Sequence, residues 1–302
     1  MLGRAVVFAS AASDFTSYMA AGLSKGAIVA LAALGFLLTF KATGVFNFAQ
    51  GSLISLGAYL AIWGSQHLGL PILIAYLMAI AMLFVIGVAI ERVAYAPLRG
   101  RSVEVVVIAT FGASIIINTI INLWFGANPQ GLDTPFDGNF RLFGASIPWQ
   151  RLVIIVATLI VVVTMIFVFD RTAVGRQVRA VAADREIAQM HGVRVAIVSM
   201  MAFGLSAALA GLAGVLIGPL GAVDVNLGFI VMLGGFSAAI LGGFGSLQGV
   251  VVGGFIIGFV EQVVGAYWFR DYQSILPFIL MLLVIAVKPT GLFTKGGAHG
   301  RL

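Results

Sequence analysis

The chain has 302 residues, of which 61% are hydrophobic and 9% are charged, and its mean hydropathy is +1.11. Soluble domains are about half apolar and about one quarter charged, so this composition excludes a soluble protein and predicts an all-α polytopic membrane protein. The net charge is +6, and because the basic residues fall in predicted loops we assign them to membrane topology rather than to nucleic-acid binding. Cysteine is absent, which excludes disulfide bonds and thiolate metal sites.

The first 17 residues contain a single arginine and an apolar run that is too short for a signal peptide, so we expect an N-terminal tail, either ordered or floppy. A membrane-spanning helix needs about 20 mostly apolar residues. By this criterion residues 18–290 form one transmembrane domain of about eight to ten helices, and a C-terminal tail, 291–302, follows it. The predicted spans are 18–40, 45–63, 71–90, 105–125, 152–169, 195–220, 229–241, 249–268 and 275–287.

Two of these spans have features of broken or re-entrant helices. The span 45–63 is interrupted early by polar residues, and the span 229–241 is short and rich in glycine. Non-helical backbone at membrane depth is tolerated only where protein or a water-filled cavity covers it. Both segments are therefore expected inside the protein, and whether either one crosses fully is left open.

Basic residues in the loops orient the chain, because positively charged loops face the cytoplasm. They follow the third, fifth and last spans, whereas the loop 128–150 carries two aspartates against one arginine. We expect the N-terminus outside and the C-terminus inside, in a bacterial inner membrane. The basic residues are Arg92, Arg99, Arg101, Arg171, Arg176, Arg179, Arg185, Arg194, Lys288, Lys295 and Arg301.

Glycines four residues apart occur in several spans. Small residues at this spacing let helix backbones approach closely in lipid. For any single pair we favour packing within one subunit over a subunit interface. The pairs are Gly22 and Gly26, Gly214 and Gly218, Gly249 and Gly253, and Gly254 and Gly258.

Uncharged polar residues in the second and fourth spans are candidates for a substrate path. Asn47 and Gln50 lie three residues apart on one helical face, and Gly51 follows them. An amide at membrane depth either lines a path or forms an interhelical hydrogen bond that fixes packing. Both interpretations stay open for Asn47 and Gln50, whereas packing is favoured for Asn118.

Two ionisable residues fall within predicted spans. Glu261 is a functional candidate because carboxylates inside membranes are costly, although it lies only about two turns from the end of its span. Lys25 lies in the outer turns of the first span, where we expect its side chain to snorkel to the interface. We find no metal cluster, catalytic triad or P-loop pattern, so we expect no enzyme activity and no cofactor or metal bound by this chain.

The segment 170–194 is a polar, arginine-rich island between two apolar spans. Thr172 is expected to cap a single helix over 176–190, about four turns long, which Gly192 would end. One interpretation is a solvated linker with basic anchors. The other is a surface helix that docks into a partner and transmits rigid-body motion.

Six stretches in collinear order resemble the permease subunits of branched-chain amino acid ABC importers, and are most similar to the H-type permease of the leucine/isoleucine/valine system. Together they cover nearly the whole chain. They are GVFNFAQGSLISLGAYLA (44–61), APLRGRSVEVVVIATFGASIII (96–117), TAVGRQVRAVAADREIAQMHGV (172–193), LAGLAGVLIG (209–218), AAILGGFGSLQGVVVGG (238–254) and VKPTGLF (287–293).

The resemblance implies a sister permease in a heterodimer, two cytoplasmic ATPase subunits that bind the ATP, and a periplasmic solute-binding protein. It implies leucine, isoleucine and valine as solutes, with urea, short amides or other amino acids as an alternative. Lys25 departs from the family pattern, in which this position is usually uncharged. The family's ATPase-coupling segment matches Gly175, Arg176, Arg179, Asp184, Glu186, Ala188 and Gly192.

A stand-alone secondary carrier or passive channel is the alternative class. A carrier usually places several ionisable residues near the bilayer midplane, and this chain has almost none. A passive pore would not need the arginine-rich segment.

Overall fold

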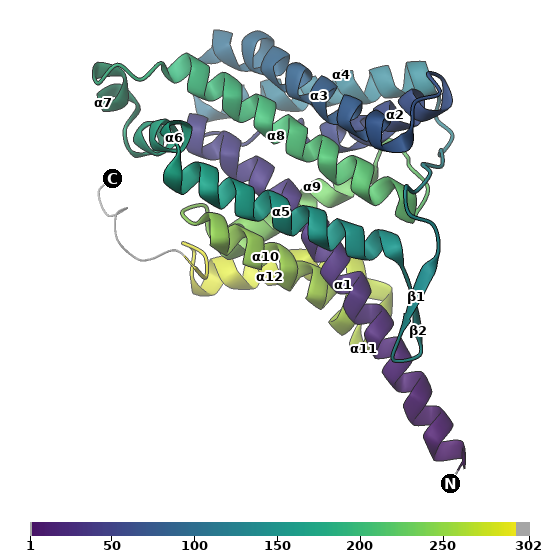
Figure 1. Ribbon diagram of the computed structural model, residues 1–302. Coiled ribbons are helices and arrows are strands. Elements are labelled where there is room, and N and C mark those ends of the chain that lie inside the picture. Colours follow the sequence, from purple (N-terminus) through teal and green to yellow (C-terminus); the bar gives the residue numbers. More distant parts are fainter. Residues whose placement is uncertain (1, 294–302) are drawn as a thin grey trace.

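The computed structural model describes residues 2–293, with side chains from residue 12 onward, and shows a bundle of long helices (Figure 1). Seven of the described helices are long and apolar enough to cross a membrane, which confirms the prediction of an all-α polytopic protein. The helical elements are α1 (Leu2–Thr43), α2 (Gln50–Gln66), α3 (Ile72–Ile90), η1 (Glu91–Tyr95), η2 (Ala96–Leu98), α4 (Val103–Phe125), α5 (Trp149–Arg171), α6 (Ala173–Ala183), α7 (Arg185–Met190), α8 (Val195–Ile217), η3 (Gly218–Leu220), α9 (Leu227–Gly242), α10 (Leu247–Phe259), η4 (Val260–Val264), α11 (Gly265–Trp268), η5 (Arg270–Ile275) and α12 (Leu276–Val287).

The helices divide into an inner and an outer set. The first span, in α1, is 83% buried, and α8 and α10 are more than half buried, whereas the last span, η5 with α12, is only 11% buried. The outer helices α3, α4 and α5 expose long apolar side chains such as Leu77, Leu123 and Val163. In water such a surface would be unstable, so these helices are built to face lipid or another subunit.

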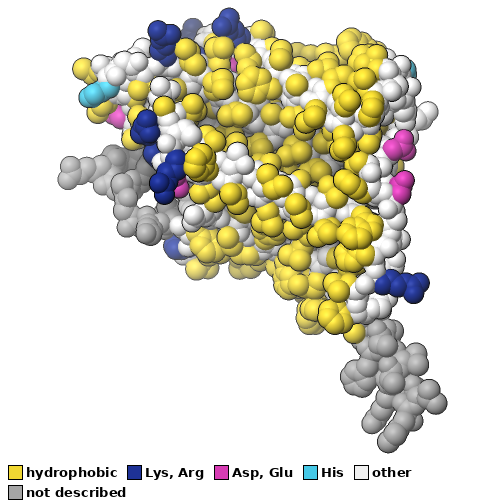
Figure 2. Space-filling view, viewed as in Figure 1, with side chains coloured by type: hydrophobic (Ala, Val, Ile, Leu, Met, Phe, Trp, Pro, Cys, Tyr) yellow, Lys and Arg dark blue, Asp and Glu magenta, His cyan; other side chains and the backbone are white. Residues whose placement is uncertain are grey.

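The two ends of the bundle differ in charge. The N-terminus and the hairpin of β1 (Asn139–Leu142) and β2 (Ala145–Pro148) lie at one end, and α6 and α7 lie at the other (Figure 1). Most of the lysine and arginine side chains visible in Figure 2 gather at the α6–α7 end. This asymmetry is the charge pattern that orients membrane proteins.

The second predicted span is a broken one. The backbone of residues 44–49 is mostly non-helical, and α2 begins only at Gln50, whose side chain is fully buried against α1 and α8. Nearly every residue of α2 is buried, which meets the requirement that irregular backbone at membrane depth be covered by protein. The other short helix, α9, is likewise largely buried.

Two regions outside the predicted spans contain regular secondary structure. Residues 2–17, which we predicted as a tail, are helical and continuous with the first span, because no proline interrupts them and alanine is abundant there. The predicted connection 128–150 contains the hairpin β1–β2, turned by Phe143 and Gly144 at positive φ. Of the predicted C-terminal tail, residues 294–302 lie outside the described residues, and so do Lys295 and Arg301.

Close glycine contacts hold the inner helices together within this subunit. Gly22 and Gly26 of α1 lie directly against Gly254 and Gly258 of α10 and their neighbours. A Cβ atom on Gly258 would stand 2.2 Å from the backbone nitrogen of Gly26. For these two pairs packing within one subunit is therefore confirmed, and it sets how α1 and α10 present their side chains.

Candidate functional site

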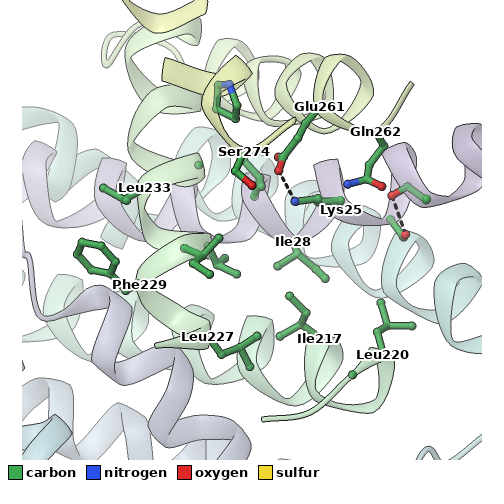
Figure 3. Close-up of a pocket in the computed structure, with 18 of the residues that line it drawn as sticks. Lys25, Ile28, Ile217, Leu220, Leu227, Phe229, Leu233, Glu261, Gln262 and Ser274 are labelled. Carbon is green, nitrogen blue, oxygen red and sulfur yellow. Dashed lines mark hydrogen bonds and ion pairs between the residues drawn. The ribbon is translucent and has the colours of Figure 1, made fainter. Parts of the chain in front are cut away.

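A cavity of about 530 Å³ lies between α1, α9, η4 and α12, toward the hairpin end of the bundle (Figure 3). Its walls are mainly aliphatic and aromatic. Three charged side chains, Lys25, Arg151 and Glu261, and the polar side chains of Gln262 and Ser274 also line it. The apolar lining includes Ile28, Ile217, Leu220, Leu227, Phe229 and Leu233.

Lys25 and Glu261 form an ion pair at the wall of this cavity. The Lys25 ammonium donates a hydrogen bond to Oε1 of Glu261, as Figure 3 shows. The Lys25 side chain is 32% exposed and that of Glu261 only 8%, so the lysine faces the open space with the glutamate behind it. The predicted snorkelling of Lys25 is therefore wrong, because the close packing of α1 on α10 brings a carboxylate within its reach.

Among the predicted substrate-path residues, Glu261 lines the cavity, whereas Gln50 does not. The Gln50 amide donates to the backbone oxygen of Ser206 (3.1 Å), and the Ser206 hydroxyl is 2.8 Å from Gln50 Oε1 and 2.9 Å from the backbone oxygen of Gly35. Gln50 thus joins α1, α2 and α8 through a fully buried network. Such a network stabilises packing, and a role for Gln50 in a solute path stays a prediction.

The other predicted path residues lie elsewhere in the core. Asn47 is buried where the broken span enters the bundle, and its Oδ1 accepts from the backbone nitrogen of Ala49. Its Nδ2 has no hydrogen-bond partner among the described residues. Gly51 packs directly on Gly228 of α9, and Asn118 lies half-buried on α4. A role for these three in a solute path stays a prediction.

Beyond the cavity, toward the α6–α7 end, aromatic and small side chains close the contact between α1 and α9. Gly235 of α9 packs on Ala32 and Ala33 of α1. About two turns past the cavity, the rings of Phe36 and Phe236 meet edge to face at 5.9 Å. Phe40, Phe46 and Phe244 continue this cluster. Among the described residues, these contacts hold α1 against α9 between the cavity and that end of the bundle.

The predicted single helix over 176–190 is wrong, because the structure has two helices that meet at Asp184. Its backbone is extended (φ −159°, ψ 118°), and its Oδ1 accepts from the backbone nitrogen of Ile187 at 2.9 Å. An aspartate at this position caps a new helix more favourably than it continues an old one. Thr172 caps α6 as predicted, and Gly192 ends the segment at φ +82°.

Several residues predicted for ATPase coupling hold this segment in place. Gly175 packs on the backbone of Phe169 at the end of α5, and the guanidinium of Arg179 donates to the Phe169 carbonyl oxygen. Ala188 is buried, and Asp184 caps α7. Gly175 and Arg179 thus fasten α6 to α5, and Asp184 fixes the start of α7.

Other residues of the segment face away from the bundle. Arg176 and Glu186 are exposed, and beside them Ile187 is 53% and Met190 86% exposed. We name these four residues the coupling surface, after the role predicted for this segment. Sequence reasoning did not single out Ile187 and Met190, because a single continuous helix over 176–190 gives no indication of the turn at Asp184 that exposes them.

A polar contact connects α7 to the interior. Arg185 donates to the hydroxyl of Tyr95 at 3.1 Å, and the Tyr95 ring packs on Phe203 of α8. The guanidinium of Arg99 lies over the same ring and pairs with the buried Glu91 of η1. These contacts link α7 to η1, at the end of α3, and through the Tyr95 ring to α8.

A family model described as "Branched-chain amino acid transport system / permease component" matches residues 18–285. LivH of Salmonella typhimurium, a high-affinity branched-chain amino acid transport system permease protein, is 31% identical over 93% of this chain and 96% of its own length. BraD of Pseudomonas aeruginosa, described in the same words, is 32% identical over 91% and 94%, respectively. A probable branched-chain amino acid transport permease protein LivH of Methanocaldococcus jannaschii is 28% identical over 88% of both chains. The chain therefore belongs to the family of branched-chain amino acid transport system permease components.

Proposed function

We propose that this chain is the membrane-spanning subunit of an ATP-driven importer for leucine, isoleucine and valine. It would pair with a sister permease, bind two ATPase subunits that supply the ATP site, and receive its solute from a periplasmic binding protein. The observation that carries the proposal is the pair α6–α7, which presents exposed Ile187 and Met190 at one end of a membrane bundle in a chain of this family.

The charge asymmetry supports the cytoplasmic placement of that end. Basic side chains concentrate around α6 and α7 (Figure 2), and positive charge marks the cytoplasmic face. The N-terminus and the hairpin then lie outside, so the cavity faces the side from which a binding protein would deliver solute. The protein would reside in a bacterial inner membrane.

A transport step follows from how the coupling surface is attached. ATPase subunits that close on ATP would displace α6 and α7, which pack on α1, α5 and α8. Displacement of α1 relative to α9 would separate Gly235 from Ala32 and part the phenylalanine rings. The cavity would then open toward the α6–α7 end while its outer side closes.

The test is co-purification of the ATPase subunits with the permease pair from detergent. The double variant Ile187→Asp and Met190→Asp is expected to lose the ATPase subunits, because it places charge on the apolar part of the coupling surface. The matched control is Phe143→Asp, an equally apolar and exposed residue (77%) in the hairpin at the opposite end. Aspartate tolerates the positive φ of that position.

Retention of the ATPase subunits by the double variant would refute the placement of the coupling surface. If the wild type purified without ATPase subunits and still moved leucine in liposomes, the importer assignment would be wrong. A stand-alone carrier would then replace it.

A further inference from the structure

The cavity has the chemistry of a binding site rather than of a featureless pore. Its volume of about 530 Å³ falls within the usual range of small-molecule sites, about 300–1,000 Å³. Most of its wall is apolar, and the paired charges of Lys25 and Glu261 lie together at one place on it (Figure 3). Such a cavity suits a small ligand with an aliphatic part and a charged part.

The charged side chains in the cavity wall indicate which charged groups a ligand would carry. Two cations, Lys25 and Arg151, and one anion, Glu261, line the cavity, so the wall has an excess of one positive charge. Arg151 already donates to the backbone oxygen of Ser17 (3.1 Å). Lys25 is the more exposed partner of the ion pair, so an entering ligand meets the ammonium first and the carboxylate behind it.

We infer that the Lys25–Glu261 pair binds the two charged groups of an aliphatic α-amino acid, and that this permease itself selects zwitterions. The ligand's carboxylate accepts from the Lys25 ammonium, and its own ammonium donates to Glu261. The aliphatic side chain lies against Ile28, Leu227 and Leu233. The inference rests on the proposed function and adds that the permease wall, as well as the binding protein, discriminates among solutes.

A zwitterion can take the place of the ion pair without leaving a buried charge unpaired. A buried carboxylate left without a partner is costly, so Glu261 needs Lys25 when the cavity is empty. A zwitterion replaces each half of the pair with an opposite charge and leaves no group unpaired. A ligand with only one of the two charges would strand either Lys25 or Glu261, which gives the site its selectivity.

The experiment measures equilibrium binding of radiolabelled leucine to the purified permease–ATPase complex without the binding protein. Unlabelled leucine is expected to displace the label. Two analogues test the charged groups: leucinamide lacks the carboxylate, and 4-methyl-2-oxopentanoate lacks the ammonium. We expect each to bind at least about tenfold more weakly than leucine, which corresponds to the loss of one hydrogen bond to a charged group. Equal displacement by all three compounds would overturn the inference.

Two double variants separate ligand binding from a purely structural ion pair. Lys25→Glu with Glu261→Lys keeps an ion pair in reversed orientation, which accepts the zwitterion only with the leucine side chain turned away from Ile28, Leu227 and Leu233. Lys25→Met with Glu261→Met removes both charges and leaves neither residue with an unpaired charge. Both variants are expected to keep the ATPase subunits and the Tm of the wild type, and to bind leucine at least about tenfold more weakly. Leucine binding at the wild-type level in either variant would overturn the inference.

The result also separates this inference from the proposed function. A wild-type complex that contains ATPase subunits and takes up leucine, but shows no saturable leucine binding of its own, would refute the binding site and leave the importer intact. If the wild-type protein neither associated with ATPase subunits nor supported leucine uptake, the proposed function would be refuted instead.

Discussion

The close contact between α1 and α10 predicts that one added methyl group lowers the stability of the protein. In Gly258→Ala the new Cβ would stand 2.2 Å from the backbone nitrogen and 2.3 Å from the Cα of Gly26, more than 1 Å inside ordinary contact. Both atoms are backbone, so the helices themselves must separate. Overpacking of this kind costs about 1–3 kcal/mol, and the better helix propensity of alanine returns only about 1 kcal/mol. We therefore expect a net loss of up to about 2 kcal/mol in the free energy of unfolding.

The assay is unfolding of the purified permease in mild detergent, followed by circular dichroism. Gly112→Ala is the matched control, because Gly112 lies inside the helix α4 and a Cβ added there would meet no neighbouring helix or side chain within 4 Å. The control is expected to match or slightly exceed wild-type stability. Equal stability changes in the two variants would show that the close contact of α1 and α10 does not limit packing, and would refute the prediction for Gly258→Ala.

Three further variants test other contacts. Gln50→Leu removes the amide that bonds to Ser206 and is expected to cost about 1–3 kcal/mol, measured by the same unfolding assay, whereas an unchanged stability would argue for a solvated amide. Asp184→Ala removes the cap of α7 and is expected to destabilise that helix by about 1 kcal/mol, seen as faster amide hydrogen exchange confined to α7. Tyr95→Phe removes the acceptor for Arg185 and is expected to lower leucine uptake per ATP hydrolysed in proteoliposomes, while ATPase association is kept; an unchanged ratio would exclude this contact from coupling.

Most spans could be predicted from the sequence, because a helix in lipid must satisfy its own backbone and cover itself with apolar side chains. Hydropathy alone therefore locates α3, α4, α5 and α8 to within a few residues. The break before α2 was also predictable, because Asn47 and Gln50 interrupt the apolar run. The break at Asp184 was missed, since propensity within a polar segment does not tell whether an aspartate continues one helix or caps the next.

The candidate site was harder to predict because it joins distant parts of the chain. Lys25 and Glu261 are 236 residues apart, and hydropathy places each in a span without saying which spans are neighbours. The signal that could have found the pair is the glycine pattern. Gly22 and Gly26 flank Lys25, and the pair Gly254 and Gly258 ends three residues before Glu261, so pairing the two motifs places the opposite charges together.

The helix α1 connects the proposed coupling surface with the cavity, because it packs along the interior of the bundle. It packs on α8, α9 and α10 and also contacts α6. Lys25 lies on the part of α1 that lines the cavity, and Lys41, at its other end, donates to the carbonyl oxygen of Gly245 beyond α9. Glycine and alanine contacts leave α1 little freedom to bend, so it transmits a displacement along its length instead of absorbing it. A movement applied at α6 would therefore reach the Lys25–Glu261 pair through one rigid helix. This helix links the proposed coupling surface directly to the cavity.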